Sequence, residues 1–316
     1  AEAPSMSDDN GTISRPAVNV MVATRDRPEL LRRTLQSIAE QEYEGLIETI
    51  VIFDRSEPAH SLAVPDGLRQ VRVITNERKP GLQGARNTGM EQSTQPVIAF
   101  CDDDDLWRPD KVRRQVELLN QHPEVHFVST GLAVEFEGET TERVADRTRI
   151  THRDLLRSRV FDATHPSTFL FRRSLVESVG LIDEDVPGGY GEDYEWILRA
   201  THETDIVTIC EPLTTVLWHQ ASFFAERWQM RIDGLRYVVD QHPGFQDEPV
   251  GLARIEGQCA FALASLGDRK AALRSAFKTM RLNWKEGRAY LAILRATGLM
   301  NSEQIMRAVQ KRGRSI

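Results

Sequence analysis

Cysteine and long apolar runs are scarce in this 316-residue chain, and acidic side chains outnumber basic ones. The three cysteines (Cys101, Cys210 and Cys259) are widely spaced, which fits neither a disulfide framework nor a zinc cluster and predicts a reducing, cytoplasmic location. No apolar run approaches the roughly 18 residues of a membrane span, and no secretory signal pattern opens the chain. The net charge of −7 argues against nucleic acid as a partner.

What the chain does contain is an ordinary globular composition, with 40% hydrophobic and 28% charged residues. This composition excludes a wholly disordered or fibrous protein. The length predicts about two domains, at roughly 150 residues each. Residues 1–16 are polar and are predicted to be a disordered tail.

Short apolar runs then alternate with segments of helical periodicity. Helices are expected from Pro28, Gly84 and Pro109, and strands at Val18–Ala23, Ile50–Phe53, Val71–Ile74 and Val97–Cys101. This alternation predicts an α/β fold, a mostly parallel central sheet with helices on both faces. Ligands of such sheets bind at the carboxyl ends of the strands. Polar residues collect there, at 24–27, 54–56 and 102–105, so we expect the site at this edge.

The second half of the chain is organised differently. Strands are expected at 125–134, 167–171 and 213–218, and a helix at 192–202. After residue 223 only helical patterns remain, interrupted by proline and glycine. We therefore expect a domain at 17–222 and a C-terminal all-helical domain at 223–316.

Four consecutive aspartates, Asp102 to Asp105, follow the fourth strand. Two unit charges ~4 Å apart repel by about 4 kcal/mol at an effective dielectric constant of 20. The dipole of the following helix accounts for one or two carboxylates, but not for four. A divalent cation with oxygen ligands converts the repulsion into coordination, so the pattern predicts Mn²⁺ or Mg²⁺.

Several segments together resemble family 2 glycosyltransferases. They are Val18–Arg27, Ile50–Ser56, Gly84–Asn87, Phe100–Trp107 and Gly191–Asp193, in the order and approximate spacing of that family. The resemblance covers about residues 17–222. It implies the GT-A fold, a Rossmann-like architecture, and an inverting transferase that uses a nucleoside diphosphate sugar, with UDP the commonest carrier in the family.

The resemblance also implies roles for residues on the donor side. Thr24, Arg25 and Asp54 would hold the nucleotide base, although the family usually has two acidic residues where this chain has Phe53 and Asp54. Arg86 would lie near the base and phosphates. The run Asp102-Asp103-Asp104 matches the Asp-x-Asp motif. In this motif Asp102 would contact ribose or metal, Asp103 would belong to the donor site, and Asp104 would ligate the metal, supported by Asp105.

Further roles follow from the same resemblance. Asp193 matches the family's catalytic base, with Glu192 as the alternative, although acidic residues in a first helical turn are also favoured by the dipole. His219 matches a histidine that lies near the metal in some members. His165, Tyr190 and Trp107 are weaker candidates for the acceptor side, and for Trp107 simple packing is the safer interpretation.

Two rival functions remain open. A nucleotidylyltransferase of related fold would have a glycine-rich loop after the first strand, where this chain has Thr24–Arg27. A non-catalytic scaffold built on the helical region would leave the carboxylates at 102–105 and 192–193 without a role.

The acceptor also stays open, and a saccharide, a lipid, a peptide or a small metabolite would each fit. The helical region could dock the acceptor, form a homodimer or cap the sheet edge. The basic residues near the C-terminus suggest one more option, contact with an anionic membrane surface; they are Arg307, Lys311, Arg312 and Arg314.

Overall fold

The computed structural model describes residues 15–218 and 227–310, with side chains to residue 306. Most of the predicted tail, His219 and the basic residues from Arg307 onward lie outside the described side chains. The described chain divides into two compact units. The first runs to Thr151 and adds Val160–Glu184 and Arg199–Trp218. The second contains His152–Arg159, Asp185–Leu198 and the described residues from 227 on. The domain boundary near 222 stays a prediction.

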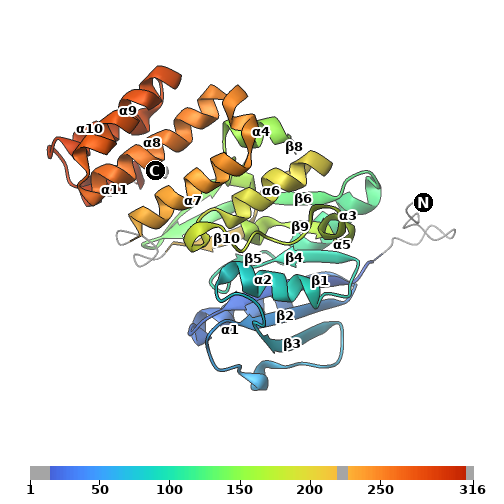
Figure 1. Ribbon diagram of the computed structural model, residues 1–316. Coiled ribbons are helices and arrows are strands. Elements are labelled where there is room, and N and C mark those ends of the chain that lie inside the picture. Colours follow the sequence, from blue (N-terminus) through green and yellow to red (C-terminus); the bar gives the residue numbers. More distant parts are fainter. Residues whose placement is uncertain (1–14, 219–226, 311–316) are drawn as a thin grey trace. The chain divides into compact units, whose positions relative to one another are not determined.

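The first unit is built on a ten-stranded sheet (Figure 1). Four of its strands are parallel neighbours, and the buried Val, Ile and Phe residues of three of them explain why these three read as continuous apolar runs, whereas the fourth, Arg69–Thr75, is only half-buried. The carboxyl ends are in register, with Thr24 opposite Phe53 and Phe53 opposite Thr75. In spatial order these strands are β3 (Arg69–Thr75), β2 (Ile47–Phe53), β1 (Val18–Thr24) and β4 (Val97–Phe100).

Beyond β4 the sheet becomes mixed. β9 (Leu170–Arg172) pairs antiparallel with β4 and with β6 (Phe127–Phe136). β10 (Ile206–Leu217) then runs parallel to β6. The apolar pattern of the sequence did not predict three strands, because two of them have only two residues and the third is polar and exposed. They are β5 (Leu106–Trp107), β8 (Arg149–Ile150) and β7 (Glu139–Arg143).

Helices cover both faces of the parallel strands, as the α/β prediction requires. On one face, Leu31 and Ile38 of α1 (Pro28–Ala39) join the core formed by alternate residues of β1 and β2, as does Val116 of α3 (Lys111–Gln121). On the other face, α2 (Leu82–Glu91) approaches Met21 and Ile52 so closely that Gly89 has no room for a side chain. Each large aliphatic side chain buried in this core contributes roughly 1.5–3 kcal/mol.

Short elements connect the remaining strands of the first unit. α5 (Arg173–Val179) follows β9, and residues of α6 (Glu192–Glu203) fall in both units. Single turns of 3₁₀ helix occur at His60–Leu62, Phe161–Ala163 and Pro166–Thr168 in the first unit, and at Pro187–Gly189 in the second. Two candidate functional residues flank the last two of these turns: His165 precedes Pro166–Thr168, and Tyr190 follows Pro187–Gly189.

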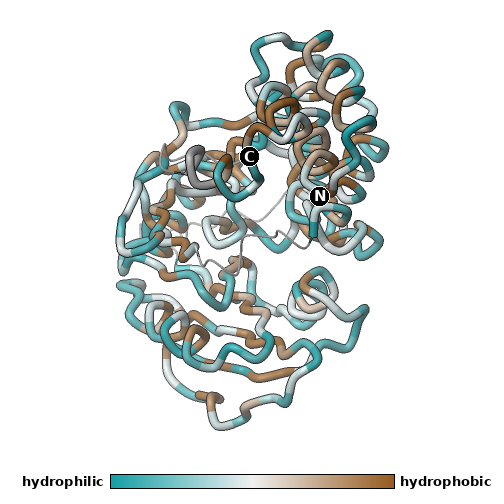
Figure 2. The backbone as a smooth tube through the Cα atoms, turned by 90° about the vertical axis from the view of Figure 1, so that its left-hand side faces the viewer, coloured by the Kyte–Doolittle hydropathy of each residue, from teal (hydrophilic) through white to brown (hydrophobic). Residues whose placement is uncertain are grey.

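The second unit is helical, as expected after residue 223. Small buried residues such as Ala260, Ala272 and Ala292 let its helices approach closely, and brown hydrophobic segments alternate with teal ones along them (Figure 2). Asp268 caps the ninth helix by accepting a hydrogen bond from the amide of Ala271 at 2.9 Å. The remaining elements are α4 (His152–Arg157), α7 (Trp228–Gln241), a 3₁₀ turn at Pro243–Asp247, α8 (Pro249–Leu266), α9 (Arg269–Leu282), α10 (Gly287–Ala296) and α11 (Ser302–Gln310).

No helix in the described part of the chain combines the length and the apolar content needed to cross a bilayer.

Candidate active site

The carboxyl ends of β1, β2 and β4 bring three predicted donor-site segments to one edge of the sheet. The amide of Asp54 donates to the carbonyl of Thr24 at 3.0 Å, and the amide of Cys101 donates to Met21 at the same distance. The parallel ladder is thus continuous up to the points where the polar segments begin. The structure therefore places Thr24, Asp54 and Asp102 where the sequence predicted them.

Asp102 to Asp105 form a turn in which the Asp105 amide donates to the carbonyl of Asp102 at 3.1 Å. Exposure of the four side chains alternates along the turn. Asp102 and Asp104 are 26% and 17% exposed, whereas Asp103 and Asp105 are 7% and 2% exposed. The first and third carboxylates, which form the Asp-x-Asp pair, are thus the ones with access to solvent.

The two buried carboxylates are held by hydroxyl groups of neighbouring elements. The hydroxyl of Thr24 donates to Asp103 at 2.7 Å, and the hydroxyl of Ser167 donates to Asp105. Ser167 also accepts a hydrogen bond from the amide of Asp102 at 3.0 Å. These contacts hold both buried carboxylates in place and fix the conformation of the turn.

Two arginines balance part of the negative charge. Arg86 is only 3% exposed and contacts Asp102 at 2.5 Å, with its guanidinium 5.5 Å from the centre of the Phe100 ring. Arg27 lies 2.9 Å from Asp104 and 3.3 Å from Asp103. Gly84, two residues before Arg86 on α2, has no room for a Cβ atom beside the carbonyl of Lys79, so the start of the helix packs closely against the preceding loop.

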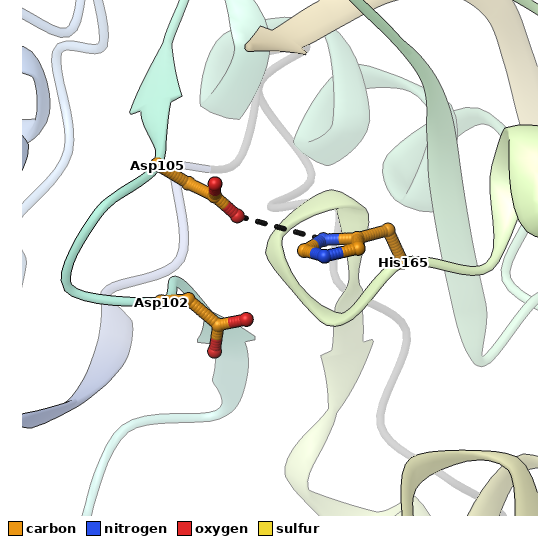
Figure 3. Close-up of side chains that lie close together, drawn as sticks. All are labelled: Asp102, Asp105 and His165. Atoms are coloured by element: carbon orange, nitrogen blue, oxygen red, sulfur yellow. Dashed lines mark ion pairs between the residues drawn. The ribbon is translucent and has the colours of Figure 1, made fainter. Parts of the chain in front are cut away.

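A histidine from a separate loop faces the turn (Figure 3). The Nδ1 atom of His165 lies 3.5 Å from Asp105, and one ligand atom from each of Asp102, Asp105 and His165 lies within 4.8 Å of the others. This grouping differs from the predicted metal ligands, since it contains Asp105 and His165 rather than Asp104 and His219. His219 lies outside the described residues, and Asp104 contacts Arg27 instead.

The electrostatics of the turn show an excess of negative charge. Burial opposes ionisation of Asp102, but the positive charge of Arg86 holds its pKa below the usual value. Burial and the charges of Asp102 and Asp103 raise the pKa of Asp104 to about 6. Burial and the same kind of repulsion raise the pKa of Asp105 well above its usual range. Carboxylate oxygens with unbalanced charge, with one imidazole nitrogen beside them, are compatible with Mn²⁺ or Mg²⁺.

Three further predicted residues of this unit differ in their surroundings. Asp54 is buried and accepts hydrogen bonds from Asn76 at 2.8 Å and from the amide of Gly81 at 3.1 Å. Arg25 is exposed and lies 3.9 Å from Asp26. Trp107 is buried, and its indole N–H donates to the carbonyl of Ser167 at 2.9 Å. Trp107 therefore packs beneath the aspartate turn.

The predicted base lies in the second unit, after a glycine-rich loop. Gly188, Gly189 and Gly191 all have positive φ angles, which residues other than glycine rarely adopt. This segment leads into the first turn of α6. Glu192 and Asp193 are both buried there. Asp193 accepts a hydrogen bond from Arg159, and its other oxygen accepts one from the amide of Tyr194 at 2.8 Å.

Aromatic rings and arginines surround this carboxylate. The Tyr194 hydroxyl donates to the carbonyl of Leu155 at 2.6 Å and accepts from Arg254 at 2.9 Å. The guanidinium groups of Arg159 and Arg254 lie 5.9 and 5.5 Å from the centre of the Tyr194 ring. Tyr190 is half-buried, with Arg231 5.4 Å from its ring centre. The environment is positively charged and firmly packed.

Sequence reasoning missed three residues that hold the candidate carboxylates. Ser167 lies in the 3₁₀ turn Pro166–Thr168 and Arg159 in a loop, and both lie far along the chain from the carboxylates they contact. Arg27, at the end of the first loop, could have been found, because the prediction already placed that loop beside the aspartates. Only tertiary structure links the other two to their partners.

Comparison with known proteins gives a family match over the first half of the chain. The model of "Glycosyl transferase family 2" matches residues 19–180. Among curated sequences, the chain is 25% identical over 201 residues to the uncharacterized glycosyltransferase YwdF of Bacillus subtilis, covering 64% of this chain and 73% of that protein. It is 24% identical over 102 residues to the Escherichia coli glucosyltransferase WfgD, named for the acceptor α-D-GlcNAc-diphosphoundecaprenol, covering 32% and 40% of the two chains.

Two solved structures share the fold across most of the chain. Staphylococcus aureus TarS 1–349 in complex with UDP-GlcNAc matches with a TM-score of 0.59 and 14% identity, covering 89% of this chain and 91% of that one. The mannosyltransferase PcManGT of Pyrobaculum calidifontis, in complex with GDP-Man and Mn²⁺, matches with a TM-score of 0.57 and 19% identity, covering 90% and 86%. The GT-A fold expected from the sequence is confirmed.

Proposed function

Because this chain belongs to glycosyl transferase family 2 and is a glycosyltransferase, we propose that it performs a metal-dependent, inverting transfer of a sugar from a UDP-sugar to an acceptor hydroxyl. The observation that carries the proposal is the aspartate turn. Asp102 and Asp104 alone of its four carboxylates have appreciable access to solvent, and two arginines do not neutralise the group.

On the donor side, we assign the nucleotide to the carboxyl ends of the first strands. Asp54 would accept hydrogen bonds from the base, with Thr24 and Arg25 beside it. Asp102 would contact the ribose or the metal, Arg86 would lie near the phosphates, and Asp103 would keep the turn in place through Thr24. UDP is preferred from the family resemblance, and a GDP-sugar is the alternative.

The metal would be held by Asp104 and Asp102, with His219 as a further candidate ligand and with Asp105 and His165 close to Asp102. When bound, Mn²⁺ or Mg²⁺ would act as a Lewis acid that offsets the charge on the departing diphosphate. Ser167 supports this arrangement by holding the Asp105 carboxyl and the Asp102 amide at once. The donor set does not by itself favour one of the two ions.

On the acceptor side, we propose Asp193 as general base, with Glu192 as the alternative. The carboxylate would remove the proton of the acceptor hydroxyl as that oxygen attacks the anomeric carbon, and the bond to the diphosphate breaks in the same step. Arg159 donates to one oxygen of the carboxylate and fixes its position. His165 and Tyr190 are proposed only as neighbours of the acceptor, and Trp107 acts through packing.

The acceptor class and the cellular setting are also proposals. WfgD is named for a lipid-linked acceptor, which supports a saccharide on a lipid carrier above a peptide or a small metabolite. Peripheral contact with a membrane then follows from the acceptor. The cytoplasmic location and the homodimer considered from the sequence are retained as proposals.

A thermal-shift panel of nucleotide sugars, with and without Mn²⁺, tests the function. At a ligand concentration 100 times Kd, binding stabilises the fold by about 2.7 kcal/mol. We expect UDP-sugars to raise the melting temperature only when Mn²⁺ is present. Stabilisation by GDP-sugars would instead reassign the base, stabilisation by nucleoside triphosphates would favour a nucleotidylyltransferase, and no response to any nucleotide would contradict the proposal.

A further inference from the structure

Helix α9 of the second unit has an unusual charge pattern. Its 14 residues include five lysines and arginines and no aspartate or glutamate, in a chain whose net charge is −7. Four of its residues at helical spacing lie on the exposed side. They are Arg274, Phe277, Lys278 and Arg281, and with Leu282 they line one shallow hollow.

Large apolar side chains accompany these cations instead of being buried. Phe277 is 58% exposed, and Trp284, two residues beyond the end of α9, is 67% exposed. The Nζ atom of Lys285 lies 5.5 Å from the centre of the Trp284 ring, and Tyr290, 42% exposed, donates its hydroxyl proton to the carbonyl of Trp284 at 2.7 Å. We call Arg274, Phe277, Lys278, Arg281 and Trp284 the basic–aromatic face.

Neighbouring acidic groups neutralise only a small part of this face. Glu256 of α8 lies 3.0 Å from Lys278, and Glu286 lies 2.8 Å from Arg288, outside the face. Arg274 and Arg281 form no ion pair with any residue of the described chain. The remaining positive charge is therefore available to an external anionic surface.

We propose that the basic–aromatic face binds the surface of an anionic lipid bilayer, an inference that builds on the proposed membrane-linked acceptor. Exposed aromatic rings partition into the headgroup region, and surrounding cations attract anionic lipids. Each lysine or arginine near such a surface strengthens binding about fivefold.

Cosedimentation of the full chain with lipid vesicles tests the proposal. We expect binding to vesicles that contain about one third phosphatidylglycerol and little binding to pure phosphatidylcholine, with binding lost at about 0.5 M salt. The double variant Arg274→Glu/Arg281→Glu should weaken binding at least tenfold, roughly as expected from the charge removed. The matched control is Arg33→Glu/Arg113→Glu, two exposed arginines on α1 and α3 of the first unit, and it should bind like the wild type.

A spectroscopic measurement separates the aromatic contribution from the charge. Tryptophan fluorescence should shift to shorter wavelength on adding anionic vesicles, and Trp284→Phe should remove most of the shift. Circular dichroism and Mn²⁺-dependent UDP binding, measured without vesicles, report whether each variant is folded. Vesicle binding requires no nucleotide. If the wild type did not bind UDP, the proposed transfer would be overturned, but the vesicle-binding measurement would still test the basic–aromatic face.

Several outcomes would overturn the proposal. They are equal binding to neutral vesicles, unchanged binding of the Arg274→Glu/Arg281→Glu variant, and equal loss in the control variant. A dimer in light scattering that dissociates in the Arg274→Glu/Arg281→Glu variant, with no vesicle binding by the wild type, would assign the face to a second copy of the chain instead.

Discussion

The aspartate turn at 102–105 and the carboxylate of Asp193 are both bound by arginine, but the balance of positive and negative charge differs between them. In the turn, four carboxylates face two arginines, and the pKa of Asp104 is raised to about 6 by burial and by its neighbours. Asp193 lies beside a second buried carboxylate, Glu192, and is bound by Arg159, with Arg254 close to the neighbouring Tyr194 ring. The first arrangement has fewer arginines than carboxylates, whereas the second has as many. The proposed cation is therefore expected only at the first.

The strongest test of this contrast is Asp193→Asn. If Asp193 is the general base, transfer should fall by about 10²–10⁴-fold, because the amide cannot accept the proton. UDP binding in the presence of Mn²⁺, measured by calorimetry, should stay within about twofold of the wild type. Near-normal turnover would exclude Asp193, and the same measurement on Glu192→Gln would then test the alternative base.

Asp104→Ala tests the aspartate turn, the second site in this comparison. Loss of one of the accessible carboxylates should weaken Mn²⁺-dependent UDP binding by about 10–100-fold, a typical cost for disturbing a metal site. His165→Ala and Asp105→Asn address the alternative grouping beside Asp102. If they abolish Mn²⁺ dependence while Asp104→Ala leaves it intact, the ligand set is Asp102, Asp105 and His165.

Arg159→Met should have a smaller effect on transfer. Without the guanidinium, one oxygen of the Asp193 carboxylate loses its hydrogen-bond donor and is less firmly oriented, so kcat should fall by about tenfold while Mn²⁺-dependent UDP binding stays unchanged. Arg159→Lys should restore part of the rate, since lysine can still donate to the carboxylate. Loss of rate together with loss of the folded circular dichroism spectrum, in both variants, would indicate a structural role only.

The smallest expected effect is on stability. The folded state raises the pKa of Asp104 from 3.8 to about 6, so without metal the fold loses stability as pH rises through that interval. Asp104→Asn removes the charge, and we expect it to stabilise the metal-free protein by about 1–3 kcal/mol at pH 7.5 and by much less at pH 4. Urea unfolding at the two pH values measures the difference.

Much of the fold could be predicted because its strands are buried on both faces and its helices are strongly amphipathic. The runs beginning at Val18 and Val97 and the helix at Pro28 needed no tertiary information. The polar strand Glu139–Arg143 could not be predicted, because it exists only through pairing with β6. Prediction of strands from apolar patterning fails where backbone pairing, not burial, stabilises the strand.

The site was predictable in composition but not in detail. Four adjacent aspartates at a strand end indicate a cation, whatever their orientation. Which of them are accessible depends on the turn and on the hydroxyl groups of Thr24 and Ser167, and Ser167 lies 62 residues from Asp105. Arg159 likewise reaches Asp193 across 34 residues. Such partners depend on the whole topology, which no local pattern encodes.

The turn at 102–105 has a consequence for how this protein can vary. Its hydrogen bond joins the first and fourth residues, and the exposed and hidden carboxylates alternate between them. Replacing one side chain alters a single position, whereas inserting or deleting one residue would exchange the outward and inward sets together. The spacing between Phe100 and Leu106 should therefore tolerate changes of residue type far better than changes of loop length.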